Sequence, residues 1–156
     1  MGKKIVPVII AVLAVILVTS YFLNFIPAKE IDEKSYITAQ VFKSPSCGCC
    51  NGYIAALKNN GFEVKSVNID DLTPIKEKHN IPSSMQSCHT TILGKYFIES
   101  HVPIEAVKKL LQDQPDIDGI ALPGMPIGTP GMPGLKESPF VIYQVKDGKY
   151  SEFMKI

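Results

Sequence analysis

The chain contains no arginine, so lysine supplies all 16 of its permanently cationic side chains. The planar guanidinium group of arginine is the one that most often contacts phosphates and guanine edges. The formal net charge is only +1, so no overall field attracts a polyanion either. We therefore expect that the protein does not bind nucleic acid.

Charge is also missing from a long N-terminal stretch. After Lys3 and Lys4, residues 5–26 (Ile5 to Ile26) carry no charge and are almost wholly apolar. As a helix rising about 1.5 Å per residue, this stretch is long enough to cross the roughly 30 Å hydrocarbon core of a bilayer. The two lysines favour the cytoplasmic side, which sends the rest of the chain outward. We predict a membrane anchor here.

A cleaved signal peptide is the alternative for the same stretch. Its cleavage site requires small residues in an A-x-A-like pattern, but Ile26 stands two places before Ala28, the candidate end. Both interpretations divide the chain into an anchor or signal sequence at 1–28, a charged linker at 29–34 and an exported domain at 35–156. In an exported domain, thiols tend to become disulfides.

Hydrophobic periodicity predicts an alternation of strands and helices in the exported domain. We expect strands at 36–42, 62–69, 90–93 and 96–100, and helices at 48–60, 73–79 and 103–114. Thr73 is the expected N-cap of the second helix. This order predicts an α/β fold, a mixed sheet flanked by helices with a thioredoxin-like architecture.

Two further features complete the domain. Residues 115–139 hold six prolines and five glycines, too many for either a helix or a strand. We predict a Gly/Pro/Met-rich loop, in which Met125 and Met132 occur in a small repeat. The chain then ends in a predicted β-hairpin, formed by residues 140–145 and 150–154 around an Asp147-Gly148 turn.

All four cysteines occur at two places, as Cys47-Gly48-Cys49-Cys50 and as Cys88-His89. The first group falls where a predicted strand gives way to a helix, and the N-terminus of a helix favours thiolate over thiol. Thiolates attack disulfides, and they also bind soft metals such as Cu(I). The cluster alone does not choose between these two roles.

Disulfide chemistry is one interpretation. Cys47 and Cys50 have the C-x-x-C spacing of a dithiol that exchanges disulfides. However, Cys49 adds a third thiol within the motif. Thioredoxin-like enzymes usually carry a cis-proline before the third strand, where this chain has Ser87-Cys88-His89-Thr90. A third interpretation is an interaction domain stapled by two structural disulfides.

Metal binding is the interpretation that uses the most residues of the cluster. If the fold is correct, Cys88 and His89 approach the other three cysteines in space. Soft thiolates select Cu(I), zinc or iron–sulfur clusters, and an exported, oxidising setting is less suited to an iron–sulfur cluster. The thioethers of Met125 and Met132 add sulfur that suits Cu(I). His101 is a further candidate ligand, with a buried polar residue as the alternative. A structural zinc site fits the spacing only loosely.

The motifs together resemble the CopG-like proteins, a bacterial family of unknown function (family 411) associated with copper resistance. The residues that carry the resemblance are Ser44 to Cys50, Ser87 to Thr90, His101-Val102-Pro103 and Pro123 to Met132. Two positions depart from the family pattern: Tyr53 replaces a frequent tryptophan, and Ser100 replaces a frequent glycine. Neither departure removes a proposed ligand.

The resemblance implies a thioredoxin-like fold in the periplasm, with copper bound through the cysteines of both motifs. By position, the implied ligands are Cys47, Cys49, Cys50 and Cys88, with His89 close by. We predict an exported Cu(I)-binding protein that contributes to copper tolerance, on the periplasmic face of the bacterial inner membrane or soluble after cleavage. A copper exporter or oxidase is the expected partner. Whether the protein is an enzyme, through copper or dithiol redox chemistry, is left open.

Overall fold

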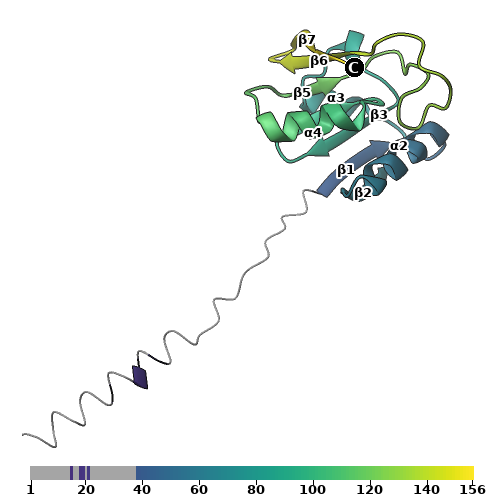
Figure 1. The fold of residues 1–156 in the computed structure, drawn as a ribbon. Coiled ribbons are helices and arrows are strands. Elements are labelled where there is room, and N and C mark those ends of the chain that lie inside the picture. The colour runs from purple at the N-terminus through teal and green to yellow at the C-terminus, as the bar shows by residue number, and fades with distance from the viewer. Residues whose placement is uncertain (1–14, 16–17, 20, 22–37) are drawn as a thin grey trace, which may run out of the picture. The chain divides into compact units, whose positions relative to one another are not determined.

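Figure 1 shows a computed structural model of the chain, which describes residues 15, 18–19, 21 and 38–156. The predicted anchor at 5–26 and the linker at 29–34 lie largely or wholly outside the described residues. Within the part that is described, no helix has the length and apolar character needed to cross a membrane. The chain divides into two units, Met1–Ser35 and Tyr36–Ile156, and the second unit contains the sheet and the site described below.

The second unit is built on one seven-stranded sheet with the order β2-β1-β3-β4-β5-β6-β7. The strands are β1 Thr38–Lys43, β2 Glu63–Asn68, β3 His89–Leu93, β4 Tyr96–Glu99, β5 Gly119–Ala121, β6 Val141–Lys146 and β7 Lys149–Lys155. The helices are α2 Gly48–Asn59, α3 Thr73–Lys78 and α4 Ile104–Asp113, with a 3-10 turn at Ser83–Met85. β1 and β2 run parallel, as do β4 and β5, and the other pairs are antiparallel. The predicted α/β class with a mixed sheet is confirmed.

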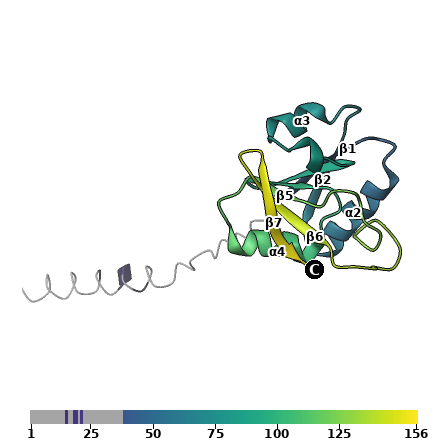
Figure 2. The same ribbon diagram turned by 90° about the horizontal axis from the view of Figure 1, so that it is seen from above.

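The helices lie on both faces of the sheet (Figure 2), with α2 and α4 on one side and α3 on the other. α4 buries Ile104, Val107 and Leu110 at helical spacing and exposes Lys108 and Lys109, as expected of an amphipathic helix. Successive strand residues point to opposite faces. Thus Ile98 packs in the core beneath α2 and α4, while its neighbour Phe97 joins a second cluster on the other face.

β5 was not predicted, because its residues lie in the stretch rich in proline and glycine. It is a three-residue strand between β4 and β6 and is buried throughout. Gly119 permits this position, since a Cβ atom there would collide with the carbonyl group of Phe97. Hydrogen bonding to strands on both sides therefore overrides the poor local preference for a strand. The prediction of one loop over 115–139 is wrong at this point.

The start of α3 also differs from the prediction. Thr73 lies inside the helix, and the N-cap residue is Leu72, which makes no side-chain cap hydrogen bond. The carboxylate of Asp71 instead accepts a hydrogen bond from the backbone N–H of Thr73 at 2.9 Å. The C-terminal hairpin is confirmed, with positive φ angles of 51° at Asp147 and 71° at Gly148. Such angles suit the tight turns of two-residue hairpins.

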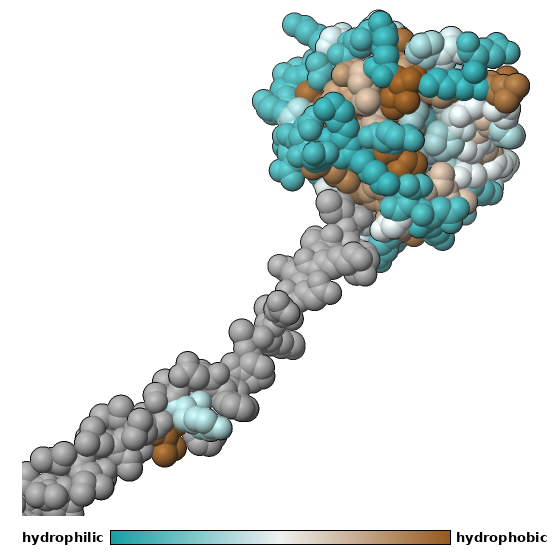
Figure 3. Space-filling model, in the orientation of Figure 1, coloured by the Kyte–Doolittle hydropathy of each residue, from teal (hydrophilic) through white to brown (hydrophobic). Residues whose placement is uncertain are grey.

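The surface of the second unit is mainly hydrophilic on the face shown in Figure 3, where apolar residues form only small separate groups. Two of the most exposed apolar side chains, Ile127 at 60% and Leu135 at 87%, belong to the loop between β5 and β6. That loop contacts the beginning of α2, where three of the four cysteines lie.

Candidate metal centre

The first three cysteines are placed by the start of α2. Cys47 is the N-cap residue, with extended backbone angles, and Cys49 and Cys50 lie in the first turn. No acidic residue occupies that turn. The positive end of the helix dipole therefore faces the cysteines, with no acidic side chain of that turn to offset it.

A disulfide joins Cys47 and Cys50, whose Cα atoms are 5.4 Å apart. Cys49 and Cys88 are free thiols. The Sγ atom of Cys49 lies 3.6 Å from that of Cys47, and the Sγ atom of Cys50 lies 3.8 Å from the carbonyl oxygen of Cys88. All four sulfur atoms lie within 4.8 Å of one another. The structure thus brings the four predicted ligands together, with two of them in the oxidised state.

Two histidines extend the cluster on the side of Cys88. Its Sγ atom lies 3.3 Å from Nδ1 of His89 and 3.3 Å from Nε2 of His101. Cys88, His89 and His101 form a second group whose donor atoms are all within 4.8 Å of one another. Cys88 therefore belongs to both groups. The structure places His101 among the candidate ligands and also buries it fully.

Burial keeps this part of the site uncharged. Burial, with smaller effects of the nearby His101 and Lys76, lowers the pKa of His89 to about 3. Burial likewise lowers the pKa of His101, against the opposing effect of a hydrogen bond to Pro130. The pKa of Cys88 is raised to about 11, first by burial and then by Cys49. Neutral imidazoles can ligate directly, whereas a metal ion bound to Cys88 must displace its proton.

Tyr53 forms the wall of the site behind the histidines. The centroid of its ring lies 4.7 Å from that of His89 and 5.7 Å from that of His101. Its side chain is fully buried, and among the described residues its hydroxyl group has no hydrogen-bond partner. Burial raises the pKa of this hydroxyl group. Tyr53 stands where the family pattern has tryptophan, so an aromatic ring is retained at this position.

Ser100, the other departure from the family pattern, has a φ angle of 74°. Glycine adopts such a conformation without the penalty that a side chain brings, which accounts for the glycine expected there. The turn at Ser100 directs the chain from β4 to His101. Its N–H group donates a hydrogen bond to the carbonyl oxygen of His89 at 3.1 Å, so it also ties the two histidine segments together.

The methionine-containing loop packs on the same end of α2. Nδ1 of His101 lies 2.7 Å from the carbonyl oxygen of Pro130. A Cβ atom at Gly131 would lie 2.5 Å from the carbonyl oxygen of Cys49, so only glycine permits this approach. Met132 is half-buried, and Met125 is 36% exposed. Contact between copper and their thioethers stays a prediction.

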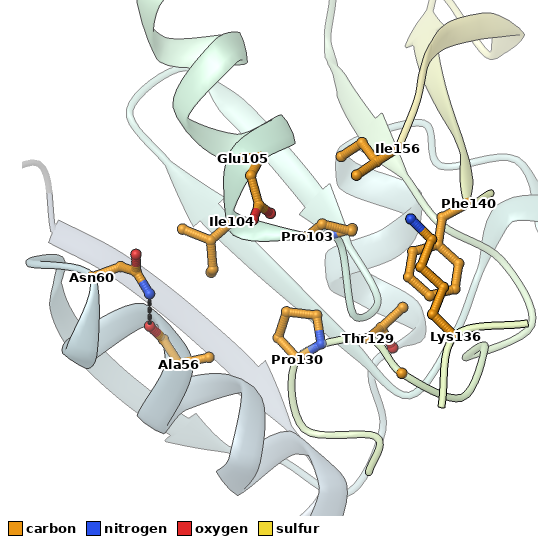
Figure 4. A pocket seen from close by; sticks show the side chains of 11 residues that line it. Ala56, Asn60, Pro103, Ile104, Glu105, Thr129, Pro130, Lys136, Phe140 and Ile156 are labelled. Atoms are coloured by element: carbon orange, nitrogen blue, oxygen red, sulfur yellow. Dashed lines mark hydrogen bonds between the residues drawn. The ribbon is translucent and has the colours of Figure 1, made fainter. Parts of the chain in front are cut away.

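A cavity of about 470 Å³ is lined in part by residues of the same loop (Figure 4). Its lining includes Asn60 at the C-cap of α2, Glu105 of α4, Pro130 and Lys136 of the loop, and the C-terminal Ile156. No cysteine or histidine lines it. The candidate ligands therefore belong to the cysteine cluster and not to this cavity.

Comparison with known proteins identifies relatives. A family model described as "Protein of unknown function, DUF411" matches residues 85–132. Two solved structures titled "Copper resistance protein copG", Form 1 and Form 2, are each 34% identical to the chain. The TM-scores are 0.71 and 0.70, and the matches cover 77% and 76% of this chain and 97% of each relative. No curated protein matches the chain.

Proposed function

Because the chain belongs to the CopG-like DUF411 family, we propose that it binds copper as Cu(I) and contributes to copper tolerance. The observation that carries this proposal is the gathering of four cysteine sulfur atoms within 4.8 Å of one another. Soft sulfur donors at this density suit Cu(I), and the group contains no carboxylate that would suit a harder ion. The proposed ligands are Cys47, Cys49, Cys50 and Cys88, with His89 and His101 as nitrogen donors beside Cys88.

Binding requires a change in the state of the cysteines. A disulfide sulfur is not a thiolate, so Cys47 and Cys50 become ligands only after their bond is reduced. That reduction takes up two electrons and two protons, which an external dithiol supplies as it is oxidised to its own disulfide. The four thiols then lose protons as Cu(I) binds. Cu(I) is here the cargo of the protein, and Tyr53 and the loop at Pro130 border its site.

The location of the protein is part of the proposal. The apolar stretch from Ile5 to Ile26 supports an anchor that places the second unit on the periplasmic face of the bacterial inner membrane. A soluble periplasmic form after signal cleavage is the alternative. A copper exporter or oxidase is the natural partner for an exported Cu(I) carrier. The strand and helix order and the position of the cysteines after β1 support a thioredoxin-like classification.

A thiol–disulfide oxidoreductase is the second candidate, and the disulfide between Cys47 and Cys50 favours it. A bond at C-x-x-C spacing at a helix N-terminus is typical of exchange chemistry. Cys49 distinguishes the two candidates. Its sulfur lies 3.6 Å from that of Cys47, close enough to share a metal ion, but it has no role in a two-cysteine exchange reaction.

The test compares the wild-type chain with Cys49→Ser, and Ser46→Ala is the control beside the motif. Each full chain is kept in mild detergent, reduced with a phosphine without oxygen, loaded with Cu(I) and desalted. We expect the wild type and Ser46→Ala to retain copper and resist alkylation, and Cys49→Ser to lose metal. A wild type without copper that reduces a disulfide substrate, with activity kept in Cys49→Ser, would establish the oxidoreductase instead.

A further inference from the structure

A buried carboxylate holds the segment that carries Cys88 and His89. Oε1 of Glu99 accepts a hydrogen bond from the backbone N–H of Ser87 at 2.6 Å. Oε2 of the same carboxylate accepts a hydrogen bond from the hydroxyl group of Thr90, also at 2.6 Å. Ser87 and Thr90 flank the Cys-His pair, so the Glu99 side chain is hydrogen-bonded to the chain on both sides of that pair.

Lys76 of α3 completes this arrangement. Its Nζ atom pairs with Oε1 of Glu99 and donates a hydrogen bond to the hydroxyl group of Thr90 at 3.2 Å. The two charged side chains are only 6% and 0% exposed. A buried ion pair is a weak source of stability, because desolvation offsets its attraction. Its presence here calls for another reason.

The geometry of the strands supplies that reason. Thr90 and Glu99 are directly paired across β3 and β4. From this pair, one strand leads back to His89 and Cys88, and the other leads through Ser100 to His101. These two segments, 88–90 and 99–101, come together again beyond the pair, where Nε2 of His101 lies 3.3 Å from Sγ of Cys88. Fixing the Thr90–Glu99 pair therefore fixes the spacing of the donor atoms.

We propose that Glu99, held by Lys76, is a positioning residue that sets the place of Cys88 and His101 in the metal site. It acts through Ser87 and Thr90, which carry no proposed ligand atom. For its effect on copper, this inference rests on the proposed function. Its effect on the protein backbone is independent of copper, so the two can be tested separately.

Two neighbouring threonines provide a matched test. Thr90 and Thr91 are both fully buried on β3. The hydroxyl group of Thr90 bonds to Glu99, whereas that of Thr91 has no partner among the described residues. Replacing partners of metal ligands typically weakens binding about 10- to 100-fold. We expect Thr90→Val to raise the Cu(I) Kd about tenfold or more, and Thr91→Val and the hydroxyl-retaining Thr90→Ser to leave it near the wild-type value.

The second measurement needs no metal. It follows hydrogen exchange of the Ser87 amide by NMR in the full reduced chain in micelles. Lys76→Met combined with Glu99→Leu removes the acceptor and leaves no unpaired buried charge. We expect at least about tenfold faster exchange of this amide, as loss of a charge-assisted hydrogen bond implies, and no change in Thr91→Val. We call the hydrogen bonds of Glu99 to Ser87 and Thr90 the Glu99 clamp. If the double variant does not fold, exchange of the Ser87 amide is measured in Thr90→Val instead, which removes the Thr90 bond of this clamp.

Equal Kd values in Thr90→Val and Thr91→Val would overturn the positioning role. An unprotected Ser87 amide in the wild type would overturn the clamp itself. A wild-type chain that binds no Cu(I) but protects the Ser87 amide would refute copper binding. It would still support the Glu99 clamp on the two residues that flank Cys88 and His89. The proposed function and this inference therefore fail in different ways.

Discussion

Nε2 of His101 faces the sulfur of Cys88 at 3.3 Å, while Nδ1 of the same ring lies 2.7 Å from the carbonyl oxygen of Pro130. A carbonyl oxygen can only accept a hydrogen bond, so Nδ1 carries the proton. In the neutral ring, Nε2 then presents its lone pair to Cys88. The methionine-containing loop thus sets the tautomer that this histidine needs in order to accept a hydrogen bond from the thiol of Cys88 or bind a metal ion.

The redox state of Cys47 and Cys50 should control copper binding. In the oxidised chain, only Cys49 and Cys88 are free, so we expect alkylation in denaturant to label two cysteines before reduction and four after it. Copper retained after desalting should fall sharply in the oxidised chain, because disulfide sulfurs are not thiolates. Mass spectrometry and metal analysis measure both quantities. Equal copper in the two states would remove Cys47 and Cys50 from the ligand set.

Cys88 should react slowly with alkylating reagents in the reduced, metal-free chain. Burial and the neighbouring Cys49 raise its pKa to about 11. At pH 8 only about one molecule in a thousand is then the reactive thiolate, and the rate should rise about tenfold per pH unit until near pH 11. Peptide mass spectrometry at several pH values gives the rate at Cys88. A plateau near pH 8.5, as in an exposed peptide thiol, would contradict this prediction.

Buried His89 should make the metal-free protein sensitive to acid. Its pKa in the folded state is lowered to about 3, so the unfolded state binds a proton more readily below about pH 6.5. The contribution of neutral His89 to the free energy of unfolding is therefore fully present above pH 6.5. It is lost as the pH falls toward 3, by roughly 4 kcal/mol in total. Urea unfolding from pH 7.5 to 4 measures this loss.

His89→Phe is the control for that measurement. Phenylalanine keeps a ring against Tyr53 but cannot take up a proton. We expect a flatter dependence of the free energy of unfolding on pH below 6.5 in this variant. An equally steep dependence in His89→Phe would assign the acid sensitivity to other groups.

Gly131 and Gly124 allow a controlled test of the loop. Both have positive φ angles, 84° and 83°, but a Cβ atom at Gly131 would meet the backbone of α2, whereas one at Gly124 would meet nothing within 4 Å. Gly124→Ala should cost about 1–2 kcal/mol of unfolding free energy from backbone strain alone. Gly131→Ala should cost clearly more and should weaken Cu(I) binding. Equal losses of unfolding free energy in the two variants would show that the loop moves away from α2 at no free-energy cost.

Elements with strong periodicity could be predicted from the sequence. α4 and the C-terminal hairpin depend on local patterns, an apolar face and an Asp-Gly turn, which the fold keeps. The gathering of the four cysteines could also be anticipated, because one group follows a strand and the other precedes one. β5 could not, since its three residues become a strand only through bonds to distant β4 and β6.

The rest of the site depends on features that have weak local signals. His101 reaches Cys88 because Ser100 takes a positive φ angle, which serine rarely adopts and a sequence does not reveal. Glu99 had one signal: it stands two places after Phe97, on the same face of a strand that is buried throughout. An acidic residue there requires a partner inside the protein. Its partner, Lys76, lies in a short helix whose other charged residues, Glu77 and Lys78, are exposed, so its sequence context resembles that of a surface residue.

The short length of β5 has a consequence for how the domain opens. It offers only three residue pairs to β4 and three to β6, whereas β6 and β7 pair along most of their length. Proteins open in cooperative units whose boundaries follow their weakest contacts. The hairpin is therefore joined to the rest of the sheet by only three residue pairs, and the fully buried side chains of Ile142 and Val145 add to its attachment. We expect the amides of this hairpin to lose their protection from hydrogen exchange before those at the end of the sheet where thiols and imidazoles meet.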